Sequence, residues 1–256
     1  MSAEQPVLTQ VADGVGRIVL NRPQAMNAIT VPLAEGLATA LATLAPRVSV
    51  IEIRGAGGNF CVGGDFKELE ALRAQGPEAM TELFTSFGRA CALVAEVDVP
   101  VVVVVEGYAM AGGFELMQAA DIALVAEDAK LADNHANFGQ VPGGGGSQRL
   151  PRLVGRQRAT AHILLGERIS GTEAAAWGLA YRAVPRTQLD AAAAELTARL
   201  AGKTREAQAR TKRLIRDGLE LPLAEGVALE RRVVVEHLTG EAAGAGIASF
   251  TARGRS

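Results

Sequence analysis

Two glycine pairs in the sequence each stand where a strand pattern gives way to a helix pattern. Gly63 and Gly64 lie within the segment 60–67, and Gly112 and Gly113 form the second pair. The first N–H groups of a helix lack a partner within the helix and lie at the positive end of the helix dipole. A glycine at such a place lets a substrate oxygen approach the N–H without obstruction by a Cβ. Two such groups aimed at one oxygen would form an oxyanion hole, although the local pattern alone also fits two tight turns.

The elements that must position these glycines alternate between strands and helices, as in an α/β fold with crossover connections. Strands are predicted at 16–20, 49–54, 101–105 and 122–125. Helices are predicted at 30–44, from about 65, at 78–96 and from about 114. The chain then becomes mostly helical, at 147–154, 156–165, 172–177, 187–201, 204–218 and 224–238, with one short strand at 181–184. We therefore predict a core of residues 1–195 followed by a helical region of residues 196–256.

Composition limits the classes of function that this chain can have. Its 256 residues are 48% hydrophobic, and 28 acidic against 26 basic side chains leave a net charge of −2. This balance argues against binding to nucleic acid or to an acidic membrane surface, and 4% aromatic residues argue against base stacking. Two cysteines are too few for a disulfide framework and predict a reducing, cytoplasmic location. The apolar run 97–105 is too short to span a membrane and predicts a buried strand.

Glycine-rich and metal-binding motifs of other enzyme classes fail on specific residues. A dinucleotide fingerprint would need glycine where Phe60 or Val19 stands, and the four glycines 143–146 are not followed by Lys-Ser or Lys-Thr. The chain contains no G-x-S-x-G and no H-E-x-x-H. Its three histidines are not at metal-ligand spacing: His135, His162 and His237. We predict no metal site.

Six segments, in order and spacing, resemble the crotonase (enoyl-CoA hydratase/isomerase) superfamily along nearly the whole chain. They are residues 20–23 with 27–28, 60–69, 100–115, 121–122, 141–150, and 166–170 with 174–178. The resemblance implies a core built as a spiral of ββα units and a C-terminal helical region that mediates trimer contacts, often in a dimer of trimers. It also implies an acyl-CoA thioester as the substrate, with CoA as part of that substrate and no separate cofactor.

The resemblance also implies roles for residues of the site. By position, the oxyanion N–H groups are those of Gly64 and Gly112, and Glu115 is the first of two acid/base residues. A partly desolvated carboxyl group there would have a raised pKa, which suits proton transfer. The second position, usually glutamate, holds His135, and Asp133 is a candidate to orient it. Without the resemblance, His135 would be interpreted as a surface residue and Glu115 as a helix-start glutamate that the dipole favours.

The exchange of a carboxylate for an imidazole leaves the reaction open. Hydration of a 2-enoyl-CoA to a 3-hydroxyacyl-CoA, through an oxyanion-stabilised enolate, is the first expectation. Some members of the superfamily with a histidine near this position hydrolyse carbon–carbon bonds in diketones, often with an acidic residue where this chain has Gly144. Isomerisation, decarboxylation and a catalytically silent acyl-CoA-binding role also fit the resemblance. Retention of Glu115 argues against the silent role, and loss of the second glutamate argues for it.

Contacts to CoA are expected at both ends of the chain. The stretch from Cys61 to Lys67 resembles the loop that lies along the adenine. The residues expected to bind CoA there are Cys61, Val62, Asp65, Phe66 and Lys67. Arg22 and Lys67 are candidate phosphate contacts, since cations on flexible stems suit a pyrophosphate. Phe250 and Arg253 match residues that close over the adenine from a neighbouring subunit, although lysine is usual in place of Arg253.

Overall fold

The computed structural model describes residues 5–240 and divides the chain into two compact units, of which the first ends at Ala201 and the second begins at Gly202. The boundary predicted after residue 195 falls inside helix α8 (Leu189–Ala201). This helix stays with the first unit because its apolar face packs on strands of the central sheet. Leu189, Ala193 and Leu196 are buried in that contact region.

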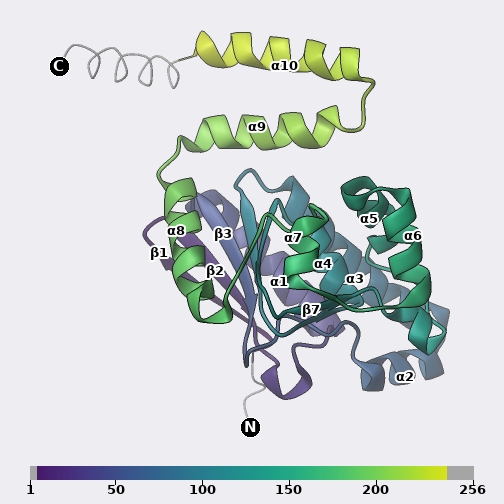
Figure 1. Ribbon diagram of the computed structural model, residues 1–256. Helices are drawn as coiled ribbons and strands as arrows, with labels where there is room; N and C mark the ends of the chain where they lie inside the picture. Colours follow the sequence, from purple (N-terminus) through teal and green to yellow (C-terminus); the bar gives the residue numbers. More distant parts are fainter. Residues whose placement is uncertain (1–4, 241–256) are drawn as a thin grey trace. The chain divides into compact units, whose positions relative to one another are not determined.

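A six-stranded sheet forms the centre of the first unit (Figure 1). Its strands, in spatial order, are β1 (Val7–Ala12), β2 (Val15–Leu20), β3 (Val50–Gly55), β4 (Val101–Val105), β6 (Ile122–Ala126) and β9 (Arg182–Val184). β1 is antiparallel to β2, and all the other neighbours are parallel. The sequence did not predict β1, because this edge strand is almost wholly exposed and carries no alternating apolar pattern.

A second sheet has three short strands, which lie in the sequence between strands of the main sheet. Its strands are β5 (Tyr108–Met110), β7 (Lys130–Ala132) and β8 (Ile169–Ser170), which are too short to show a period in the sequence. The chain passes from β4 to β5 to helix α4 (Gly112–Ala119), and later from β6 to β7 to helix α5 (Gly146–Val154). Each turn thus supplies one strand to each sheet and then a helix. This is the predicted spiral of ββα units.

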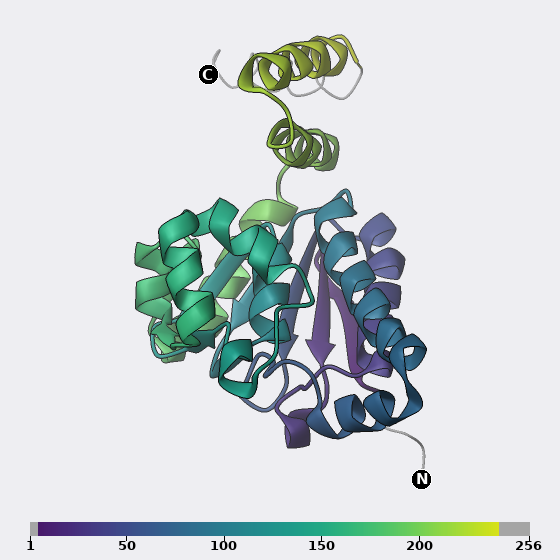
Figure 2. The ribbon, with the colours of Figure 1, turned by 90° about the vertical axis from the view of Figure 1, so that its right-hand side faces the viewer.

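Helices cover both faces of the main sheet, with α8 on the opposite face from α1 and α3 (Figures 1 and 2). The remaining helices of this unit are α1 (Val31–Leu44), α2 (Phe66–Gln75), α3 (Pro77–Glu96), α6 (Arg156–Leu165) and α7 (Gly171–Ala176). The helix starts follow local rules. The Thr30 side chain caps α1 and the Asp65 side chain caps α2 by accepting backbone N–H bonds.

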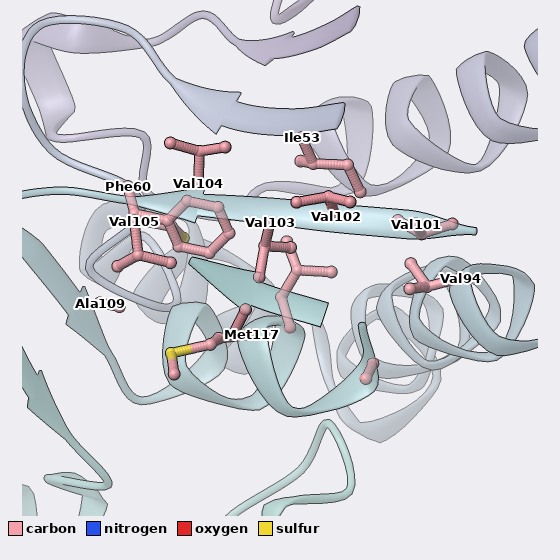
Figure 3. Close-up of a cluster of buried hydrophobic side chains, with 14 of the residues drawn as sticks. Ile53, Phe60, Val94, Val101, Val102, Val103, Val104, Val105, Ala109 and Met117 are labelled. Carbon is pink, nitrogen blue, oxygen red and sulfur yellow. The ribbon is translucent and has the colours of Figure 1, made fainter. Parts of the chain in front are cut away.

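Strand β4 is buried along its whole length, and its five valines are at most 2% exposed. Figure 3 shows valine side chains on both faces of this strand, with Met117 of α4 packed below it. A continuous apolar run is typical of a parallel strand covered on both faces, so the prediction of a buried strand is confirmed. Every residue of α4 is buried as well. Any polar side chain on α4 is therefore inside the protein and needs partners there.

In the described part of the second unit, residues 202–240, the helices α9 (Arg205–Gly218) and α10 (Leu223–Leu238) pack on each other. Arg210 of α9 pairs with Glu236 of α10 at 3.7 Å. The predicted helical C-terminal region is therefore confirmed as far as residue 240. None of the helices within residues 5–240 has both the length and the apolar character that crossing a membrane requires.

Candidate active site

Residues 60–65 form one wall of the site and present the first glycine N–H. The Ile29 N–H donates to the carbonyl of Gly63 at 2.7 Å, and the Asp65 N–H donates to the carbonyl of Ile29 at 2.9 Å. The segment thus pairs with Ile29 in the manner of a parallel bridge. Successive backbone groups of an extended segment point to opposite sides. The N–H of Gly64, which lies between the two bonded residues, therefore points away from Ile29.

A sharp turn at Ala111 presents the second N–H. Ala111 has φ 46° and ψ −120°, a left-handed conformation that is strained by about 1–3 kcal/mol for a residue with a Cβ. Its N–H donates to the carbonyl of Ala132 on β7, and its carbonyl accepts the N–H of Glu115, both at 2.9 Å. The turn redirects the chain from β5 into α4. Gly112 is then the first helical residue, and its N–H has no acceptor within the helix.

The backbones of these two segments are in contact at Gly63 and Gly112. A Cβ added to Gly63 would lie 3.1 Å from the Gly112 nitrogen and 2.7 Å from the Ala111 Cβ, so this position requires glycine. The nitrogen of Gly64 is the next backbone atom but one after the Gly63 Cα. Within residues 5–240, no protein acceptor takes the N–H of Gly64 or of Gly112. Both glycines line the same cavity, so two unoccupied donors lie close together there.

Glu115 lies in the first turn of α4 and is 1% exposed. Its Oε1 accepts the N–H groups of Gly144 and Gly146, each at 2.8 Å. Its Oε2 lies 3.9 Å from Nε2 of His135. A Cβ on Gly144 would collide with the ring of Phe87 and stand 3.0 Å from Oε2. The glycine loop therefore holds one carboxylate oxygen and leaves the other facing the imidazole.

His135, which follows β7, is 8% exposed and lies against a buried carboxylate. Its Nδ1 is 2.7 Å from Oδ1 of Asp133, so the predicted contact between these residues is present. The Asp133 N–H donates to Nε2 of His162 at 3.1 Å. The ring of His162 packs against Phe114 and Trp177, with centroids 5.2 Å and 5.7 Å away. With Asp133 ionised, Nδ1 of His135 carries the hydrogen and Nε2 is the atom that faces Glu115.

Burial and neighbouring charges shift the pKa values of Glu115 and His135. Burial raises the pKa of Glu115, and hydrogen bonds from Gly146 and Gly144 and the charge of His135 offset this only in part. Burial lowers the pKa of His135, but the hydrogen bond and charge of Asp133, together with the charge of Glu115, outweigh it and raise that pKa. The pKa direction predicted for Glu115 is therefore found. The net effect of burial, hydrogen bonds and charge is thus to raise the pKa of both groups above their ordinary values.

These groups open onto a cavity of about 1450 Å³, which is larger than a pocket for a small metabolite alone. One wall is apolar and comes mainly from α2 and α3: Leu69, Met80, Leu83, Phe84 and Phe87. Arginine and lysine side chains also line it: Arg22, Lys67, Arg73 and Arg168. No set of three or more His, Cys, Asp or Glu side chains suited to a metal ion occurs in residues 5–240.

Most of the residues predicted to bind CoA line this cavity, namely Arg22, Val62, Asp65, Phe66 and Lys67. The Arg22 guanidinium is already engaged, since its Nη2 lies 2.8 Å from Oδ2 of Asp65. Lys67 is exposed, and no carboxylate in the described part of the chain pairs with it. Phe66 is 56% exposed and meets Phe138 edge-on, with ring centroids 5.3 Å apart. Lys67 is thus the more available cation of the two candidates.

Cys61 differs from the other predicted contacts because it does not line the cavity. It is fully buried, and burial raises the pKa of its thiol to about 12. Its N–H donates to the carbonyl of Tyr108, and its carbonyl accepts the N–H of Met110, both at 2.9 Å. Cys61 therefore extends the small sheet behind the wall. Phe250 and Arg253 lie outside the described residues.

Two sets of contacts were not predicted from the sequence. The loop N–H groups that hold Glu115 belong to the glycine run 143–146, for which the sequence predicted no contact with Glu115. The run itself was a usable signal, because consecutive glycines allow close backbone approach to a side chain. The bond from Asp133 to His162 joins residues 29 positions apart, and no local pattern marks it.

Comparisons of the sequence and of the structure with known proteins all give matches to one family. A family model described as enoyl-CoA hydratase/isomerase matches residues 10–255. The chain is 32% identical over 249 residues to a protein of Mycobacterium bovis named "Probable enoyl-CoA hydratase", covering 96% of this chain and 95% of that one. It is 34% identical over 222 residues to a mitochondrial enoyl-CoA hydratase of Pongo abelii, covering 86% and 74%. A crystal structure of an enoyl-CoA hydratase from Bacillus anthracis superposes with a TM-score of 0.92 at 30% identity, covering 97% of both chains.

Proposed function

This chain belongs to the enoyl-CoA hydratase/isomerase family, and from that premise we propose that it hydrates a 2-enoyl-CoA to a 3-hydroxyacyl-CoA. The observation that carries the proposal is the pair Glu115 Oε2 and His135 Nε2. These atoms lie 3.9 Å apart on the wall of the cavity that Gly64 and Gly112 also line. A water molecule can stand within hydrogen-bond distance of both atoms at that separation.

The thioester carbonyl is the group that the glycines would hold. In the proposed complex its oxygen accepts the N–H groups of Gly64 and Gly112, which have no protein acceptor within residues 5–240. Water attack at Cβ shifts electrons through Cα to this oxygen, which then carries the negative charge of an enolate. Each donor of such a site lowers the barrier by about 3 kcal/mol. The large cavity leaves room for the CoA part, whose binding positions the reacting carbons.

Two side chains would move the protons. Glu115 Oε2 takes a proton from water as the water oxygen bonds to Cβ. His135, protonated on both nitrogens, gives its Nε2 proton to Cα as the enolate collapses. The proton on Glu115 then passes to His135 across the 3.9 Å gap and restores both groups. The net reaction adds H and OH across the carbon–carbon double bond. A general acid and a general base of this kind each raise the reaction rate by a factor of about 10²–10⁴.

A spectroscopic assay tests the proposal directly. The conjugated enoyl thioester absorbs in the ultraviolet, and hydration removes that absorbance. Purified protein is mixed with a panel of 2-enoyl-CoA esters of different chain length, and the product is identified by mass as substrate plus water. Loss of absorbance with that product supports hydration. Tight binding by calorimetry with no turnover across the panel would instead support a catalytically silent acyl-CoA-binding protein.

Hydrolysis of a carbon–carbon bond is the second candidate, and the contact between Asp133 and His135 favours it. An imidazole backed by a carboxylate can activate water for attack on a β-carbonyl as well as on an enoyl carbon. Water labelled with ¹⁸O separates the two reactions. Hydration places the label in a 3-hydroxyacyl-CoA, and hydrolysis of a 3-oxoacyl-CoA places it in a released carboxylic acid. Isomerisation or decarboxylation would incorporate no label.

The proposal extends to the CoA part and to assembly. Arg22 and Lys67 on the cavity wall are proposed to meet the CoA phosphates, and substitution of Lys67 by methionine is expected to raise KM without changing kcat. We also propose a homotrimer or a dimer of trimers, in which Phe250 and Arg253 would reach a neighbouring subunit. Light scattering that gives a monomer mass would contradict this part of the proposal.

A further inference from the structure

Behind His135 a chain of buried hydrogen bonds continues away from the cavity. His135 Nδ1 contacts Asp133 Oδ1 at 2.7 Å, and the Asp133 N–H contacts His162 Nε2 at 3.1 Å. We propose that Asp133, anchored by His162, is a positioning residue that holds His135 with Nε2 toward Glu115 and stabilises its protonated ring. This inference rests on the proposed function, because it concerns the proton donor of that reaction.

The tautomer of His135 follows from this contact. A neutral imidazole has one N–H, and the nitrogen that carries it is set by the partner of the ring. A carboxylate only accepts, so Asp133 fixes the hydrogen on Nδ1. The second proton can then enter and leave only at Nε2, which lies 3.9 Å from Oε2 of Glu115. Without Asp133, the ring could place its single hydrogen on either nitrogen or turn over.

The backbone of Asp133 is held as firmly as its side chain. His162 accepts the Asp133 N–H, which it can do only while its Nε2 is unprotonated, and burial lowers the pKa of His162. Phe114 and Trp177 pack against the His162 ring and fix its plane. His162 is 3% exposed and Asp133 is fully buried. The carboxylate is thus placed by a rigid acceptor and not by a mobile loop.

Folding stability alone does not account for this carboxylate. The Oδ2 atom of Asp133 is buried and has no hydrogen-bond partner within the described residues. A buried, half-satisfied carboxylate destabilises a fold relative to a neutral side chain of the same shape. Asparagine would offer the same acceptor to Nδ1 of His135 without the charge. What the carboxylate adds is a negative charge beside the ring, and this stabilises the imidazolium form.

The charges that face His135 predict a measurable change in the pH–rate profile when Asp133 is replaced. The titratable groups that face its ring are Glu115 from α4 and Asp133 from the segment after β7. In the proposed reaction Glu115 must be ionised and His135 protonated, so the rate falls at low pH through Glu115 and at high pH through His135. Removal of the Asp133 charge should move the alkaline limb of the pH–rate profile and leave the acidic limb nearly in place.

The test is the variant Asp133→Asn in the full-length protein. We expect kcat to fall by at least about 10-fold with KM within about twofold, because Asp133 does not line the cavity. The alkaline limb should move to lower pH by about one unit or more. The matched control is Asp128→Asn, which removes the same charge from an exposed turn between β6 and β7 and should change neither quantity. An unchanged alkaline limb in a folded Asp133→Asn variant would overturn the inference.

Nuclear magnetic resonance gives a readout that needs no turnover. The chain has three histidines, so ¹⁵N-histidine labelling yields a short spectrum that His135→Gln assigns. In the unaltered protein, His135 should show hydrogen on Nδ1 at high pH and a pKa above the ordinary histidine value. In Asp133→Asn this pKa should drop. Hydrogen on Nε2 in the unaltered protein refutes the inference even where the variant does not fold. A protein that shows the expected spectrum but hydrates no enoyl-CoA refutes the proposed function alone.

Discussion

Replacement of Glu115 by glutamine separates catalysis from folding. The glutamine Oε1 can still accept the N–H groups of Gly144 and Gly146, which lie 2.8 Å from the present oxygen. An amide nitrogen then stands where Oε2 faces His135. That nitrogen donates hydrogen bonds and cannot take a proton from water. The shape and the loop contacts of the residue are therefore kept, while its function as a base is removed.

The substitution should lower kcat, but it should not lower the free energy of unfolding. Loss of a general base lowers kcat by about 10²–10⁴-fold, or about 3–5 kcal/mol in the barrier. Burial raises the pKa of Glu115 in the folded protein above its unfolded value. The stability that this carboxyl group contributes is therefore full below its unfolded pKa and is lost as pH rises through the folded pKa. Glutamine carries no such penalty, so the free energy of unfolding at neutral pH should equal or exceed that of the unaltered protein, and the difference should shrink toward acidic pH.

Two measurements check the reasoning. Enoyl-CoA absorbance gives kcat, and denaturant unfolding measured over a series of pH values from acidic to neutral gives stability. Glu82→Gln is the matched control, because Glu82 is exposed on α3 and does not line the cavity. It should leave both quantities unchanged. A Glu115→Gln variant that keeps more than about a tenth of the rate, or that loses stability at neutral pH, would refute the assignment of Glu115 as a buried base.

Three further substitutions address the other parts of the site. Gly112→Pro removes the N–H at the first helical position and should lower kcat by about 10²-fold or more; a normal rate in the folded variant would exclude this donor. His135→Ala should lower kcat by about 10²-fold, and an unaltered rate would remove it from the proton transfer. Gly146→Ala would put a methyl group 3.0 Å from Glu115 Cγ and should lower kcat by about 10-fold or more, whereas Gly88→Ala, which meets no atom within 4 Å, should leave kcat unchanged. Equal rates for these two alanine variants would show that the glycine loop does not position the carboxylate.

Local sequence patterns account for much of the fold. The buried strand 101–105, the capped start of α1 at Thr30 and the start of α2 at Asp65 all follow from residue types within a few positions. Gly112 at the start of α4 was recognisable for the same reason, since a helix start is a local event, whereas the role expected of Glu115 came from the family resemblance. The short strands of the small sheet were not predicted, because two or three residues carry no period.

The working parts of the site depend on contacts between distant segments. Gly63 meets Gly112, the Gly144 N–H meets Glu115, and the Asp133 N–H meets His162. Each contact is made when the ββα turns stack, and stacking depends on the burial of apolar faces over the whole unit. Residue types and spacing thus identified which groups could take part in chemistry. Only the packed protein decided which of them meet and which oxygen of Glu115 remains available, because these distances arise from long-range packing and leave no periodic mark on the chain.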